Sequence, residues 1–183
     1  MAKTIELAKG TYCWMLSDDD LLKPGAIARI LTEIESDCDV YLCNVLVCDS
    51  SMKPFRKNFW LKSEVNDHIF HLHKDKEFID YCDKANSLGA IFSYMSAIIL
   101  RREAWNVEGF DEEFDGSAYA LASSLLSFTK RKCKLKYIRR SLVLWRLENR
   151  TFSFKDGLVA RIMLDFNGYY RLADKYLNDN IRG

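Results

Sequence analysis

The sequence lacks any apolar run that approaches the roughly 20 residues needed to cross a bilayer, so any membrane contact is expected to be peripheral. It shows no signal-peptide pattern, and none of its six cysteines forms a C-x-x-C pair. Several of these cysteines lie inside apolar runs, as small buried hydrophobic residues do. We therefore expect reduced thiols and a cytoplasmic setting.

Net charge is also nearly absent: the 183-residue chain carries a formal charge of +1. This excludes a global attraction for nucleic acid or for a strongly acidic partner. The charge is uneven, however, because residues 130–150 contain nine basic side chains and one acidic one, whereas 108–115 contain five acidic and no basic ones. The basic run would suit a polyprenyl-diphosphate-linked ligand or the anionic inner-membrane surface, or it is a solvated face.

With 49% hydrophobic residues, the chain can bury a core as one domain spanning residues 1–183. Its first part, residues 1–50, has a βαβ pattern. Residues 11–16 are apolar on both faces and predict a buried strand, Pro24 is expected to open a helix, and residues 38–49 predict the next strand. This order predicts parallel pairing of the two strands and an α/β core.

The remaining pattern is less regular, but several elements are expected from periodicity. They are a strand or loop at 54–61, a helix at 73–85, a strand running into a helical turn at 94–105, a helix at 118–131, two short strands within 135–147, and a helix at 156–178. The last helix carries an apolar stripe, which we expect to serve core or dimer packing rather than to lie in a membrane. It lacks the excess of Lys and Arg that interfacial helices carry.

Three adjacent carboxylates, Asp18, Asp19 and Asp20, follow the first predicted strand and precede the first predicted helix. That position is the carboxyl edge of a sheet, where open α/β folds bind ligands. Adjacent carboxylates repel one another unless a cation neutralises them. Mg²⁺ and Mn²⁺ prefer oxygen ligands and usually take one or two protein carboxylates together with phosphate oxygens. The triplet is thus either a metal–diphosphate site or a solvated turn with one aspartate capping the helix.

The segment GTYCWMLSDDDLLKPGAI, residues 10–27, resembles the central motif of family 2 glycosyltransferases of the GT-A fold. In that family a strand runs into an aspartate cluster, the DXD motif, and L-L-x-P-G-A follows. YMSAIILRREAWNVEGFDEEF, residues 94–114, is similar to the acceptor-side segment that contains G-F-D-E. GSAYALASSLLSF, LVLWRLENRTFSF and GLVARIMLDFNGYYRLAD resemble the tail of the abequosyltransferase-like branch, which adds sugars to lipid-linked O-antigen units.

This resemblance covers almost the whole chain and implies a Rossmann-like mixed sheet flanked by helices. It implies that Asp19 binds a divalent cation, Mg²⁺ or Mn²⁺, and that Asp18 and Asp20 contact the donor, a nucleotide-diphosphate sugar. Ser17 stands where the family often has its first aspartate. The implied reaction is an inverting transfer of the sugar to a glycan or to a polyprenyl-diphosphate-linked acceptor, in polysaccharide biosynthesis.

The chain also departs from the family. It starts one helix before the aspartate strand, so the N-terminal βαβ units that hold the nucleotide are expected to be missing, and dimerisation is one way to cover the strand left exposed. The Glu-Asp pair that usually follows G-F-D-E is absent, and Asp115 is the nearest candidate for the catalytic base. In the acceptor-side region, residues 90–183, Trp105 and Arg146 are candidate acceptor contacts, and Trp105 is equally suited to the core. The alternative function is a catalytically silent fragment, or a binding or assembly module, of the same fold.

Overall fold

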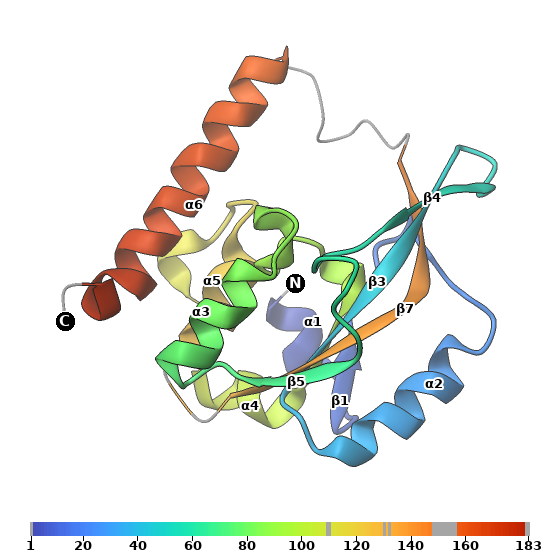
Figure 1. The fold of residues 1–183 in the computed structure, drawn as a ribbon, viewed down its shortest axis with the longest axis horizontal. Coiled ribbons are helices and arrows are strands. Elements are labelled where there is room, and N and C mark those ends of the chain that lie inside the picture. Colours follow the sequence, from blue (N-terminus) through green and yellow to red (C-terminus); the bar gives the residue numbers. More distant parts are fainter. Residues whose placement is uncertain (1, 109–110, 130, 132, 148–156, 182–183) are drawn as a thin grey trace.

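In a computed structural model, which describes residues 2–108, 111–129, 131, 133–147 and 157–181, a mixed sheet is flanked by helices (Figure 1). The expected α/β class is confirmed. The strands are β1 (Tyr12–Trp14), β2 (Leu21–Leu22), β3 (Val40–Cys48), β4 (Pro54–Asn58), β5 (His68–His71), β6 (Ile98–Arg101) and β7 (Lys134–Arg146). The helices are α1 (Ala2–Leu7), α2 (Ala26–Glu33), α3 (Asp75–Asp83), α4 (Arg102–Glu108), α5 (Ala120–Thr129) and α6 (Gly157–Ile181). Short 3₁₀ turns lie at η1 (Ile34–Ser36), η2 (Leu88–Ala90), η3 (Met95–Ala97) and η4 (Glu112–Phe114).

The central strand is β3, which is apolar on both faces and almost entirely buried. The strand order is β1-β6-β3-β7-β2, with β4 pairing with β3 and β5 with β7. The strands predicted at 11–16 and 38–49 are β1 and β3, and these are not neighbours in the sheet. The prediction that they pair in parallel is therefore wrong. β6 inserts between β1 and β3 and is antiparallel to both, so these two strands run in the same direction without touching as neighbours. The parallel neighbour of β3 is β7.

The segment predicted as two short strands is a single strand, β7, with a register shift opposite Asn44. The Asn44 side chain is fully buried and fills this irregularity. Its amide nitrogen donates to the Tyr137 hydroxyl at 2.6 Å and to the Arg139 carbonyl at 2.8 Å, and its amide oxygen accepts from the Trp60 backbone N–H at 2.9 Å. The Asn44 side chain thus supplies hydrogen bonds at the register shift, where the backbone hydrogen bonds between β3 and β7 are interrupted.

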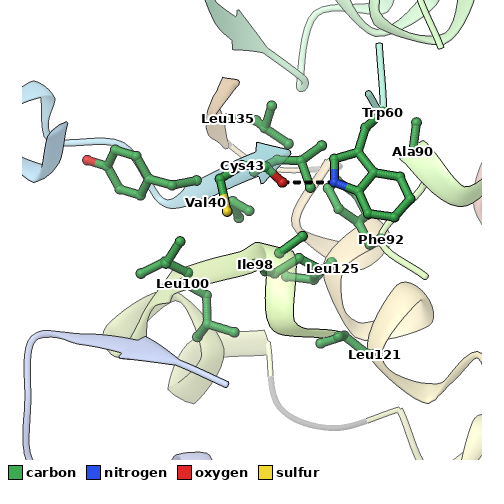
Figure 2. Packing of buried hydrophobic residues seen from close by; sticks show 14 of the residues in the cluster. Val40, Cys43, Trp60, Ala90, Phe92, Ile98, Leu100, Leu121, Leu125 and Leu135 are labelled. Atoms are coloured by element: carbon green, nitrogen blue, oxygen red, sulfur yellow. Dashed lines mark hydrogen bonds between the residues drawn. The ribbon is translucent and has the colours of Figure 1, made fainter. Parts of the chain in front are cut away.

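The core lies mainly between the sheet and helices α4, α5 and α6. Figure 2 shows Trp60 packed beside Ala90 and Phe92, with its indole N–H donating to the Cys43 carbonyl at 2.8 Å. The six cysteines are free, and five of them are buried, as small apolar residues. No helix in the part of the chain that the structure describes is both long and apolar enough to cross a membrane.

Helix α2 lies on the other side of the sheet from α3, α5 and α6 (Figure 1). It begins at Ala26, after Gly25 in the left-handed conformation at φ 79°, rather than at Pro24 as predicted. Only part of the apolar stripe of α2 is buried. Ile30 is buried, whereas Ile27 and Leu31 are exposed.

Helix α6 runs alongside α5, at the edge of the molecule opposite β7 and α2 (Figure 1). The stripe predicted to pack in the core is displaced in the structure. Exposed members of the stripe are Val159, Ile162, Met163, Phe166 and Tyr170, and the buried residues are instead Gly168, Leu172 and Tyr176. The stripe was expected to serve core or dimer packing. Core packing within this chain is wrong for the exposed five, and dimer packing stays a prediction.

Candidate active site

A cleft of about 1240 Å³ opens where six segments of the chain meet. They are the aspartate loop after β1, the turn region before β6, the loop leading into α5, helix α6, helix α1 and the end of β7. Asp19 and Asp20 line the cleft from the first segment, and Asp115 lines it from the third. The fold therefore brings into one cavity carboxylates that are far apart in the sequence.

The side chains of the acidic triplet lie in three different environments. Asp18 is exposed and is not among the described residues that line the cleft. Asp19 is half-buried, lines the cleft and accepts a hydrogen bond from the Ser17 hydroxyl. Asp20 is buried, only 3% exposed. Of the three, Asp19 is the carboxylate best placed for a ligand, and the prediction of a donor contact for Asp18 has no support in this geometry.

Asp20 is held in place by partners from the turn region before β6 and from the end of β7. One of its carboxylate oxygens accepts from the Ser96 hydroxyl at 2.5 Å and from the Tyr94 hydroxyl, and the other accepts from the Arg146 backbone N–H at 3.4 Å. Burial raises the pKa of Asp20, although the bonds from Ser96 and Tyr94 oppose that shift. Ser96 also accepts from the Ser17 backbone N–H at 3.0 Å, so these contacts fix the loop that carries Asp19.

The Arg146 side chain supports the same loop from the end of β7. Its Nη1 donates to the Ser50 carbonyl at 2.8 Å and its Nε to the Asp19 carbonyl at 3.4 Å. Arg146 and Trp105 are not among the described residues that line the cleft, and Trp105 is 1% exposed in the core. The predicted acceptor contacts therefore need correction: the Arg146 guanidinium binds backbone carbonyls, and Trp105 packs in the core.

Asp115 also lines the cleft, in an exposed turn. Its carboxylate accepts from the Gly116 backbone N–H at 2.9 Å, and Gly116 has a φ of 70°, which a residue with a side chain rarely adopts. Asp111, in contrast, is a structural residue. It binds Ser123, Tyr176 and Lys175, and so ties the acidic loop to α5 and α6.

Several cleft residues were not predicted. Tyr94 and Trp145 form one aromatic pair, with ring centroids 4.9 Å apart, and Tyr119 and Tyr169 form another at 5.2 Å. Asp165 lines the cleft from α6 and accepts a hydrogen bond from the Tyr119 hydroxyl. These residue types are visible in the sequence. The contacts of Tyr119 with Tyr169 and Asp165, however, depend on how α6 packs against the rest of the chain, which periodicity does not predict.

Among the described residues, those that line the cleft carry a net negative charge. Their charged members are Lys3, Glu6, Asp19, Asp20, Asp115 and Asp165. The one cation among them, Lys3, lies 3.3 Å from Glu6. A polyanionic ligand would therefore be repelled unless a cation accompanied it.

The donor set of the cleft fits a Mg²⁺ or Mn²⁺ ion that is shared with a substrate. No group of three or more candidate ligand side chains is found among the described residues, so this part of the chain does not form a full protein cage. Mg²⁺ commonly binds through one or two carboxylates, with water and phosphate oxygens in its other positions. Asp19 could supply such a carboxylate.

No protein-family model matches the chain. The chain is similar to the abequosyltransferase RfbV of Salmonella typhimurium, with 32% identity over 97% of this chain and 54% of that protein. It thus spans about half the length of the curated relative that it matches, and the similarity agrees with the branch indicated by its motifs. The crystal structure of S. aureus TarS, residues 1–349, shares the fold with a TM-score of 0.54 and 10% identity, over 98% of this chain and 51% of that one.

Proposed function

We propose that this chain forms the metal-binding and acceptor-side part of a family 2 glycosyltransferase that moves a sugar from a nucleoside-diphosphate donor to a hydroxyl group of a glycan or lipid-linked acceptor. The observation that carries the proposal is the placement of Asp19, on the family's DXD motif, at the wall of a large acidic cleft that also holds Asp115 and Asp165. The similarity to an abequosyltransferase supports a role in O-antigen or related polysaccharide synthesis. The free cysteines support a cytoplasmic location.

The chemistry would follow from the charges of the cleft. A divalent cation bound through Asp19 would neutralise the donor diphosphate and the charge that it gains on departure. Asp20, with Ser96 and Tyr94, would hold the loop so that Asp19 faces the cleft. The aromatic pair Tyr94 and Trp145 lies beside this loop and offers an apolar wall to the donor.

Calorimetric titration of the chain with UDP-, GDP-, CDP- and dTDP-sugars tests the proposal. We expect one donor to bind saturably with Mn²⁺ and to lose binding when EDTA replaces the metal. Asp19→Asn should weaken that binding by about tenfold or more, which is about 1.4 kcal/mol. Asp18→Asn removes the same charge one residue away, on an exposed side chain, and should change the affinity by less than about twofold.

The alternative is a binding or assembly module of the same fold. It is favoured by the lack, among the described residues, of a group of three candidate metal ligands. If none of the four donors binds at any Mn²⁺ concentration, the module is the better description and the transferase proposal is contradicted. Equal losses in the Asp18 and Asp19 variants would contradict the assignment of the metal to Asp19.

A further inference from the structure

The cleft also contains an acidic side chain on α6, Asp165, that the sequence motifs did not identify. Asp165 is half-buried on α6, in the wall that also contains Asp115. One of its carboxylate oxygens accepts a hydrogen bond from the hydroxyl of Tyr119, a residue that is 4% exposed and itself lines the cleft. The orientation of this carboxylate is therefore fixed by a side chain that is packed in place.

The close approach of α6 to Tyr119 depends on a glycine. A Cβ atom on Gly168 would lie 2.0 Å from Cε2 of the Tyr119 ring, so only glycine allows the helix to lie this close. Tyr169, the next residue, packs edge-on against the same ring at an interplanar angle of 69°. The two rings thus form an aromatic wall next to the Asp165 carboxylate.

The acidic loop before α5 holds the helix in this position. Asp111 accepts from the Lys175 ammonium group at 2.8 Å and from the Tyr176 hydroxyl, and Glu113 accepts from Lys175 at 2.7 Å. The Arg171 guanidinium lies 4.8 Å from the ring centroid of Phe114. Asp111, Glu113 and Phe114 therefore help to position α6, and with it Asp165.

We infer that Asp165, oriented by Tyr119, is the general base of the acceptor site, a role that rests on the proposed transferase function. Asp115 is the weaker candidate because it is exposed in a turn and accepts from its own neighbour Gly116. A base must hold its carboxylate in one orientation next to the hydroxyl that it deprotonates. Asp165 meets that requirement on a helix, beside a wall suited to a sugar ring.

The step balances as follows. The Asp165 carboxylate takes the proton of the acceptor hydroxyl, and the hydroxyl oxygen forms a bond to the anomeric carbon of the donor sugar. The bond from that carbon to the diphosphate oxygen breaks, and the nucleoside diphosphate leaves with the electron pair. Inversion at the anomeric carbon follows if the attack comes from the face opposite the leaving group.

The test measures nucleoside diphosphate release from the donor identified by calorimetry, with octyl glycosides of galactose, mannose, glucose and rhamnose as acceptor probes. Asp165→Asn should lower kcat by about 100-fold or more, with the donor Kd unchanged within about twofold, which also shows that the variant is folded. Tyr119→Phe should lower kcat about three- to tenfold, and should lower it no further in the Asp165→Asn background.

Asp174→Asn is the matched control, because Asp174 is an exposed aspartate on the same helix, and its kcat should equal that of the wild type. If Asp165→Asn keeps its rate while Asp115→Asn loses 100-fold, the inference is overturned and the proposed function stands. Donor binding without release of product on any acceptor would also count against the base. Failure of every donor to bind would instead overturn the function on which the inference rests.

Discussion

Gly168→Ala tests the docking of α6 on Tyr119. The higher helix propensity of alanine should stabilise the variant, whereas the contact of its methyl group with Tyr119 should destabilise it. Alanine is favoured over glycine inside a helix by about 1 kcal/mol. The added methyl would lie 2.0 Å from the Tyr119 ring, however, which is impossible without movement of the ring or the helix. Overpacking of this kind costs about 1–3 kcal/mol, and loss of the Tyr119 bond to a carboxylate adds about 1.5–3 kcal/mol.

We therefore expect Gly168→Ala to reduce the free energy of unfolding by about 1.5–5 kcal/mol, which corresponds to a fall in Tm of roughly 3–20 °C for a chain of this size. Urea unfolding followed by far-UV circular dichroism measures this change. The matched control is Asn167→Ala, one residue earlier and exposed, which should be neutral or slightly stabilising. In a Tyr119→Ala background, where the ring is absent, Gly168→Ala should no longer destabilise. If Gly168→Ala is as stable as the wild type, the docking described for α6 is wrong.

Two further predictions concern buried polar groups. Asn44→Ala removes three hydrogen bonds, two of them to buried groups, and should cost about 2–5 kcal/mol in urea unfolding, whereas a loss below about 1 kcal/mol would show that the β7 irregularity does not need this amide. For Asp111, burial alone would raise the pKa, but bonds from Lys175 and two hydroxyls outweigh it and lower the pKa to about 2. The stability that Asp111 contributes should therefore be complete above its ordinary pKa of 3.8 and should be lost as the pH falls toward about 2, and Asp111→Asn should flatten this acid limb.

Much of the fold follows from local patterns, because long buried strands and amphipathic helices carry their own signal. The β3 strand is apolar on both faces and was predicted within two residues, and α3 and α5 lie inside their predicted ranges. Strand order was not predicted, since periodicity does not say that β6 lies between β1 and β3. The continuity of β7 was also missed, because it depends on Asn44, a side chain from another strand.

The candidate site divides in the same way. Asp19 and Asp115 were identified because they lie in or next to contiguous motifs, and both line the cleft. Asp165, Tyr119 and Tyr169 were missed because their contact is tertiary and depends on a glycine whose space is visible only once α6 is docked. Arg146 was selected because it ends a predicted strand in the basic run, a position that does not reveal that its Nη1 and Nε donate to backbone carbonyls.

Electron paramagnetic resonance of Mn²⁺ tests the central claim most directly, because the signal of the free ion falls when the ion becomes bound. With the nucleoside diphosphate of the preferred donor present, we predict that the wild-type chain and Asp18→Asn reduce the free-ion signal beyond what the nucleotide does alone, and that Asp19→Asn does not. A free-ion signal that is the same with the wild-type chain and with Asp19→Asn would contradict the account.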